Sequence, residues 1–151
     1  MKPFRDFLFE SVQAFHGTGA NFDIFDMSHG GEATGATNGV LGIFFTTEFK
    51  KADELYAGRR GTVIEATITL RNPIRLKGLE YDADASAAVN QAASEYCDKH
   101  RDDLTTQDFR EYREFLERQG HDGIEVHLHH GDTDYIVFSP AQITNIHKIA
   151  P

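Results

Sequence analysis

The chain has 151 residues and a formal net charge of −9, from 15 Lys and Arg against 24 Asp and Glu. Hydrophobic residues make up 40% and charged residues 26%, which excludes a disordered chain and a collagen. No apolar run approaches the ~18 residues that a bilayer crossing needs, so no membrane contact is expected. The acidic balance also argues against a protein that coats nucleic acid by charge, although a transient nucleic-acid substrate stays open.

The length predicts one domain over residues 1–151, with residues 1–10 as an N-terminal lead-in. The single cysteine, Cys97, has no internal disulfide partner, so nothing indicates an oxidising compartment. The N-terminus has neither a long apolar stretch nor a small-residue cleavage site. We therefore expect a cytoplasmic monomer, in the producing cell or in a target cell.

The first half of the chain predicts strands separated by a long loop. Alternation over residues 12–16 predicts a strand that ends at Gly17. Residues 17–42 hold seven of the 13 glycines and are expected to form a loop, and loops this long are usually functional or disordered. Residues 43–45 are typical of a buried strand. A helix capped by Thr46 or Thr47 is expected to follow and to run to residue 57.

The second half mixes strands and helices. Residues 62–70 predict the clearest strand, with its apolar face on alternate residues, and residues 74–76 a short one. Helices are expected over residues 85–100 and from Thr105, the second with an apolar stripe. Three strands follow, over residues 123–128, 135–138 and 143–149. The order predicts an α+β fold and not an alternating doubly wound sheet.

Three segments carry residues suited to chemistry. The first is Phe15-His16-Gly17-Thr18-Gly19, where a strand ending in His-Gly presents an imidazole and a backbone that a ligand can approach closely. The alternative is a surface histidine beside an ordinary turn.

The second segment is Gly42-Ile43-Phe44-Phe45-Thr46, followed by Tyr56. Two aromatic rings from neighbouring elements can sandwich a flat ring, and a cationic ring adds roughly 0.5–2 kcal/mol. The alternative is that Phe44 and Phe45 simply pack in the core.

The third segment is Thr133-Asp134-Tyr135-Ile136-Val137-Phe138-Ser139-Pro140-Ala141-Gln142-Ile143. A carboxylate at the mouth of an apolar strand is costly unless it serves a hydrogen bond or a charge. Asp134 is therefore placed to stabilise a developing cation at a sugar carbon, or else it caps the strand entry, as turn aspartates often do.

In this order the three segments resemble the ADP-ribosyltransferase fold, in its diphtheria-toxin and poly(ADP-ribose) polymerase branch with a His–Tyr–Glu signature. The segments 21–26 and 120–124 are similar to the ADP-ribosyltransferase domain of phage polyvalent proteins. The resemblance spans about residues 14–146. It implies an α+β fold with a split, mainly antiparallel sheet and flanking helices.

The resemblance also implies roles for individual residues. His16 would bind a ribose hydroxyl of NAD, and the backbone at Gly17, with Thr18, would hold the nicotinamide carboxamide. Phe44 takes the place of the motif tyrosine, beside Phe45, and would sandwich the nicotinamide with Tyr56. Asp134 takes the place of the catalytic glutamate. The resemblance thus implies three catalytic residues, Asp134, His16 and Phe44, and no metal. It implies that NAD is bound by His16, Gly17, Thr18, Phe44, Phe45 and Tyr56.

Two of these positions depart from the family pattern. Phe44 keeps the ring face but lacks the hydroxyl of tyrosine. Asp134 is one methylene shorter than glutamate, and misplacement by ~1 Å can cost on the order of 100-fold in rate.

The implied function is an NAD-dependent mono-ADP-ribosyltransferase, phage-borne or a toxin, that acts on a macromolecular acceptor, a protein in preference to nucleic acid. The alternatives are a non-enzymatic NAD- or ADP-ribose-binding module, an NAD glycohydrolase and an RNA 2′-phosphotransferase.

Two further groups of residues have two interpretations each. The first group is a cluster of His127, His129, His130 and Asp132. It is either a solvated turn, which is also a place where an acceptor can bind, or part of a metal site. A metal site would need a further ligand from elsewhere in the chain, and none is evident. The basic residues 59–60, Arg71, Arg75 and Lys77 either bind the NAD pyrophosphate or an acidic acceptor, or are solvated.

Overall fold

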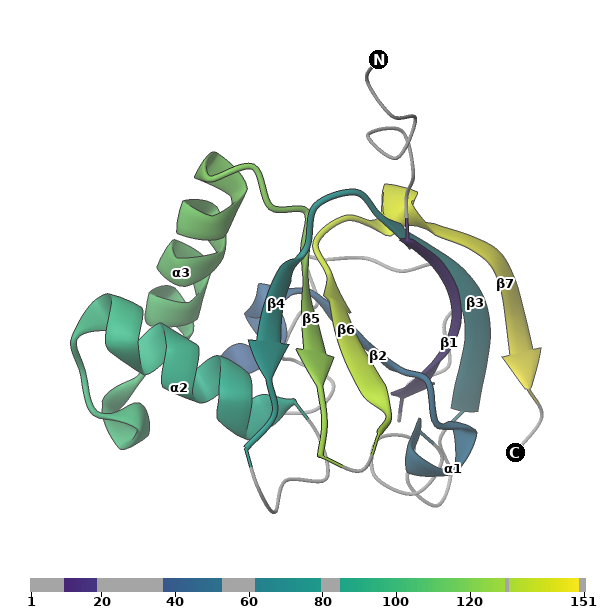
Figure 1. Cartoon of the computed structure of the whole chain (residues 1–151), viewed down its shortest axis with the longest axis horizontal. Helices are drawn as coiled ribbons and strands as arrows, with labels where there is room; N and C mark the ends of the chain where they lie inside the picture. Colours follow the sequence, from purple (N-terminus) through teal and green to yellow (C-terminus); the bar gives the residue numbers. More distant parts are fainter. Residues whose placement is uncertain (1–9, 19–36, 53–61, 80–84, 130, 150–151) are drawn as a thin grey trace.

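The structure is a computed structural model that describes residues 10–18, 37–52, 62–79, 85–129 and 131–149. Its seven strands form one sheet in the order β4-β5-β6-β2-β1-β3-β7, with two longer helices beside it (Figure 1). The α+β prediction is therefore confirmed. Among the described residues, no helix is long and apolar enough to cross a membrane.

The strands follow the alternation of the sequence. Their bounds are β1 Glu10–Thr18, β2 Ile43–Thr46, β3 Thr62–Leu70, β4 Ile74–Lys77, β5 Gly123–His127, β6 Thr133–Val137 and β7 Ile143–Ile149. All pairs within the sheet are antiparallel except β4 with β5, which is parallel. The sheet is nearly split between β1 and β2, because these two strands share the single register pair Phe15–Thr46.

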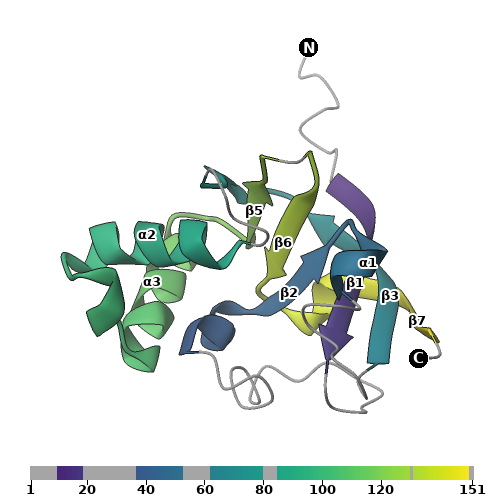
Figure 2. The same cartoon turned by 90° about the horizontal axis from the view of Figure 1, so that it is seen from below.

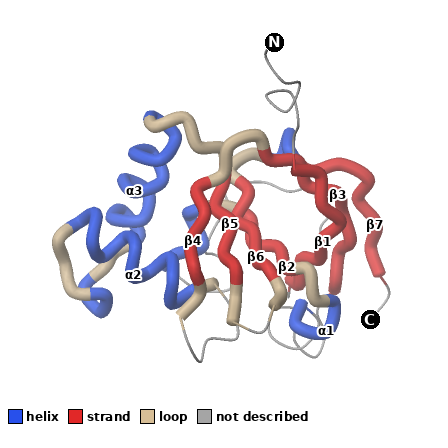
Figure 3. The backbone as a smooth tube through the Cα atoms, viewed as in Figure 1, coloured by secondary structure: helices blue, strands red, loops and turns tan. Residues whose placement is uncertain are grey.

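Two helices, α2 (Ser86–Cys97) and α3 (Thr106–Arg118), cover the outer face of β4, β5, β6 and β2 (Figures 1 and 3). The predicted cap of α3 is confirmed: the Thr105 hydroxyl accepts the Asp108 N–H while the Asp108 carboxylate accepts the Thr105 N–H. Helix α2 ends three residues earlier than predicted, at a left-handed Asp98. The sheet and the two helices enclose an outer core in which Phe109 and Leu116 are fully buried.

The inner face of the sheet forms a second core. The sheet curls so that β1, β3 and β7 face back toward β5 and β6 (Figure 1). The alternating residues of β3 that were predicted to be apolar and buried line this core, together with Phe45, Tyr135 and Val137. At one end of the curled sheet, the side chain of Leu70, the last residue of β3, lies against Gly123, the first residue of β5.

The segment after β2 differs from the prediction. The described helix α1 is short (Phe49–Lys51) and its N-cap is Glu48, not Thr46 or Thr47. Thr46 is instead the last residue of β2, and its hydroxyl accepts the Glu48 N–H at 3.2 Å. The helix lies beside β1 and β3 (Figure 2), where Ala52 packs against Val63. The expected remainder of this helix, and the N-terminal lead-in, lie outside the described residues.

The predicted glycine-rich loop is described only at its ends. Strand β1 extends through Gly17 to Thr18, and a short 3-10 turn, Thr37–Leu41, precedes β2. Residues 19–36 lie outside the described residues.

Candidate functional site

Asp134 lies inside β6, one residue after its start, not before the strand as predicted. It stands opposite Thr46 of β2 on one side and Val126 of β5 on the other, so its side chain faces the outer core. The residue is 1% exposed, and its Oδ2 accepts the backbone N–H of Ala85 at 3.1 Å. The carboxylate therefore holds the start of α2, where a helix favours negative charge.

Phe44 shares this outer face. It lies opposite Ile136, two residues from Asp134, and packs half-buried against the outer core. Thr46 completes the face: it is 0% exposed and stands directly across from Asp134. Thr46 was predicted as a possible helix cap and as the last residue of the segment Gly42–Thr46, without a role on this face. The period of two along β2 was the signal that puts it on the same face as Phe44.

His16 lies on the inner face instead. Its ring packs tilted against that of Phe45, with 5.5 Å between centroids. Its Nδ1 is 2.6 Å from the carbonyl oxygen of Phe44. Because a carbonyl only accepts, Nδ1 carries the proton and Nε2 is the acceptor nitrogen of the neutral ring. Burial lowers the pKa of His16, and the bond to the Phe44 carbonyl offsets part of that effect, which favours this neutral form.

The predicted residues are therefore divided between two faces of the sheet. Asp134 and Phe44 share the outer face, whereas His16 and Phe45 share the inner face. The two sets of residues come closest where β1 and β2 diverge. At this point the His16 ring forms a hydrogen bond with the backbone carbonyl of Phe44.

The remaining predicted NAD-binding residues are partly described. Gly17 is buried and stands opposite Val63 of β3, and Thr18 pairs with Thr62. Tyr56 lies outside the described residues, so the proposed ring clamp rests on Phe44 alone.

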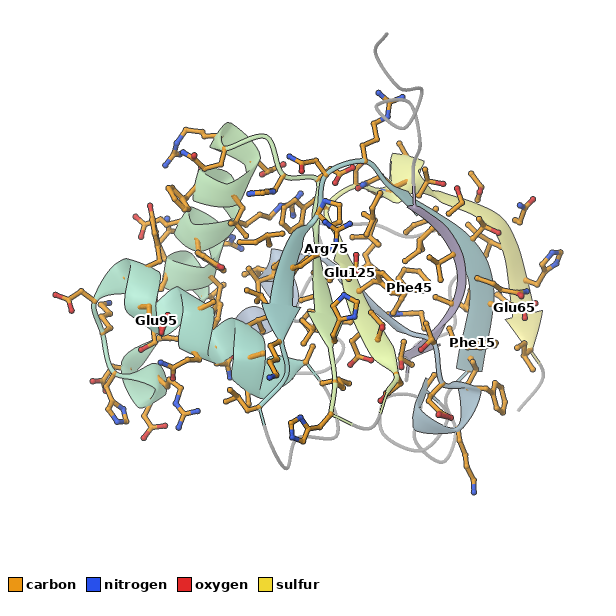
Figure 4. The ribbon with its side chains drawn as sticks, in the orientation of Figure 1. Phe15, Phe45, Glu65, Arg75, Glu95 and Glu125 are labelled. Carbon is orange, nitrogen blue, oxygen red and sulfur yellow. The ribbon has the colours of Figure 1, made fainter. Side chains whose placement is uncertain are left out.

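A second buried carboxylate, Glu125, was missed. It lies on the inner face of β5 opposite Tyr135, and it is 3% exposed (Figure 4). His127 Nε2 lies 2.7 Å from its Oε1, and Arg75 Nε lies 3.6 Å from its Oε2. Glu125 lies between the apolar residues Ile124 and Val126, so the alternation of β5 places it on the opposite face of the sheet from them. This alternation was the sequence feature that could have drawn attention to Glu125.

These contacts bear on the two open interpretations. His127 contacts a carboxylate, and in the described part of the chain no group of three His, Cys, Asp or Glu side chains is arranged to hold a metal. Arg75 and Lys77 are exposed on β4, with Arg75 beside Glu125. Residues 59–60 and 130 lie outside the described residues.

A cleft of about 530 Å³ lies at the other end of β6, beyond Phe138. Arg71, His121 and Gln142 line it. Arg71 is one of the basic residues considered for the NAD pyrophosphate, whereas His16, Phe44 and Asp134 lie elsewhere. Backbone and side-chain bonds to Asp122, from Arg71, Asn72 and Gln142, tie its walls together. The cleft lies at the junction of three chain segments, around residues 69–72, 117–122 and 138–142.

Comparison with known proteins identifies the family. The family described as "ADP-Ribosyltransferase in polyvalent proteins" matches residues 10–150. The chain belongs to this family. Membership supports ADP-ribosyltransferase activity in general and confirms the suspected fold. No curated protein matches the chain.

One solved structure is similar to this chain. It is described as "Crystal structure of an anti-CRISPR protein", with 17% sequence identity and a TM-score of 0.45. The similarity covers 92% of this chain and 96% of that one.

Proposed function

We propose that this ADP-ribosyltransferase family member is an NAD-dependent mono-ADP-ribosyltransferase that modifies a macromolecule. The family match over residues 10–150, together with Asp134 and Phe44 on one face of adjacent strands, is the observation that carries this proposal. The polyvalent-protein description favours a phage-borne or toxin-like role.

In the proposed reaction the bond between the ribose anomeric carbon and nicotinamide breaks, and its electron pair leaves with nicotinamide. The acceptor nucleophile then forms a bond to the anomeric carbon and loses its proton. Positive charge develops on the ribose, as in glycoside hydrolysis. Asp134 would accept the ribose 2′-hydroxyl hydrogen bond and stabilise that charge, while Phe44 would lie against the nicotinamide ring.

His16 and Gly17 have supporting roles in this proposal. The Nε2 of the neutral His16 ring would accept a ribose hydroxyl, because Nδ1 already donates to Phe44. The backbone at Gly17, with Thr18, would bind the carboxamide. The net charge of −9 favours a protein acceptor over a nucleic acid, because phosphates repel an acidic surface.

A second candidate is an NAD-binding module without transfer activity. The burial of Asp134 and its bond to Ala85 favour it, because that carboxylate already has a structural task. The absence of a hydroxyl at Phe44 points in the same direction.

The test is the release of nicotinamide from NAD, with and without a cell lysate as the source of acceptors. We expect lysate-dependent release by the wild type and a loss of at least about 100-fold in Asp134→Asn. Asp103→Asn is the matched control, because Asp103 is exposed on the turn Arg101–Asp103 and loses the same charge. Release without lysate would indicate a glycohydrolase, and NAD binding without release would indicate the binding module.

The acceptor is identified in the same assay. Labelled NAD with lysate, followed by protease or by nuclease, reports whether the label is attached to protein or to nucleic acid. Protease-sensitive label is expected. Nuclease-sensitive label would overturn the protein-acceptor part of the proposal.

A further inference from the structure

The carboxylate of Asp134 is closed off by the start of α2. Asp134 is 1% exposed, and both Ala85, which donates its N–H to Oδ2, and Thr46, across the strand pair, are 0% exposed. A ribose cannot reach an oxygen that is covered in this way. The described form therefore differs from any form in which Asp134 contacts NAD.

The hydrogen bond between Ala85 and Asp134 also holds the N-terminal end of α2 in place. The N-cap position is Ala85, which has no side chain able to cap, and the first turn contains no acidic residue. Asp134 comes from β6, 49 residues away, and brings a negative charge to the positive end of the helix. This bond thus couples the position of the start of α2 to the availability of the carboxylate oxygen Oδ2.

We propose that the Ala85–Asp134 contact is an autoinhibitory latch, in which the Ala85 N–H occupies the carboxylate oxygen and NAD binding displaces it. This inference rests on the proposed function, because it assigns the ribose of NAD to Asp134. The apparent affinity for NAD is then the intrinsic affinity multiplied by the fraction of molecules in which the latch is open.

The direct test removes the donor. Ala85→Pro deletes the backbone N–H, and the backbone φ of −78° at this position suits proline. Ala85→Gly is the matched control at the same residue, because it keeps the backbone N–H and glycine is accepted at an N-cap. A hydrogen bond to a charged group is worth roughly 10- to 100-fold in an equilibrium constant. We expect Ala85→Pro to bind NAD about tenfold more tightly by calorimetric titration, and Ala85→Gly to bind as the wild type does.

Hydrogen exchange of the wild type gives a second readout that needs no variant. Saturating NAD is expected to speed exchange in a peptide that begins several residues before Ala85 and runs into α2, so that it contains the Ala85 amide, while peptides elsewhere become more protected. Stronger protection of that peptide with NAD would overturn the latch, whether or not Ala85→Pro folds.

The outcomes separate the latch from the proposed function. If the wild type binds NAD and Ala85→Pro, with unchanged circular dichroism, binds no more tightly, the latch fails and the function stands. Binding by Ala85→Pro but not by the wild type would support both. If neither binds NAD, the proposed function fails and the latch with it.

Discussion

The Nδ1 atom of His16 on β1 lies 2.6 Å from the carbonyl oxygen of Phe44 on β2, where the two strands diverge. Strands β1 and β2 share the single register pair Phe15–Thr46. The His16 side chain adds a further hydrogen bond between the two strands. It also sets the tautomer of the ring. One contact therefore supports the sheet and orients a residue proposed to bind NAD.

Substitutions at His16 should separate these two roles. His16→Ala removes the donor and leaves the Phe44 carbonyl without it, so we expect a loss of about 1–3 kcal/mol in the free energy of unfolding. His16→Asn keeps an amide donor near the position of Nδ1, so it should recover more than half of that loss. Urea denaturation measures both. Equal losses in the two variants would argue against a structural hydrogen bond.

The stability of the protein should depend on pH through His16. Because burial lowers the pKa of the folded-state imidazole, the unfolded chain binds the proton more readily. The contribution is fully present above the unfolded pKa, about 6.5, and is lost as the pH falls through the folded pKa. We expect the free energy of unfolding of the wild type to fall relative to His16→Asn between pH 7 and pH 5. Parallel curves for the two proteins would contradict this.

Gly42 should tolerate no side chain. Its φ is +156°, and an added Cβ would lie 2.4 Å from the Val137 carbonyl oxygen. Gly120 also has positive φ, +91°, but the nearest atom to an added Cβ is 3.8 Å away. We expect Gly120→Ala to cost about 1–2 kcal/mol from backbone conformation alone. Gly42→Ala should cost about 1–3 kcal/mol more, because β2 must move away from β6. Similar melting temperatures for the two variants would mean that β2 shifts without cost.

Removing the His127 partner of the buried Glu125 should lower the free energy of unfolding. His127→Ala deletes a donor at 2.7 Å from Oε1, whereas Arg75 is 3.6 Å from Oε2, so we expect a loss of about 1–3 kcal/mol. Replacing a buried ionic group by an apolar one of similar size is often neutral. The double variant Glu125→Leu/His127→Ala should therefore lie within about 1 kcal/mol of the wild type in urea denaturation. A double variant less stable than His127→Ala alone would assign Glu125 a further stabilising contact.

Local patterns were enough to place most of the elements. The alternation over residues 62–70 predicted β3, and the segment 143–149 after Pro140 was predicted as the strand β7, both with their observed bounds. The Thr105–Asp108 capping box marked the start of α3, because both of its bonds lie within four residues. The entry to β6 was missed because Asp134 has a low strand propensity, and its pairing with Thr46 of β2 and Val126 of β5 overrides that propensity.

The candidate site was predictable as a set of segments but not as an arrangement. By itself the sequence determined the family and the order of the motifs that contain His16, Phe44 and Asp134, since these follow from residues close together along the chain. Only the tertiary structure decided that His16 faces the inner core while Asp134 faces the helices, because strand register sets which side chains share a face. It also decided that Asp134 is held by Ala85, a partner 49 residues away that no local spacing indicates. The chain's acidic charge argues against holding polyanions by bulk electrostatics, but the availability of one buried carboxylate depends on a helix packed from elsewhere in the chain.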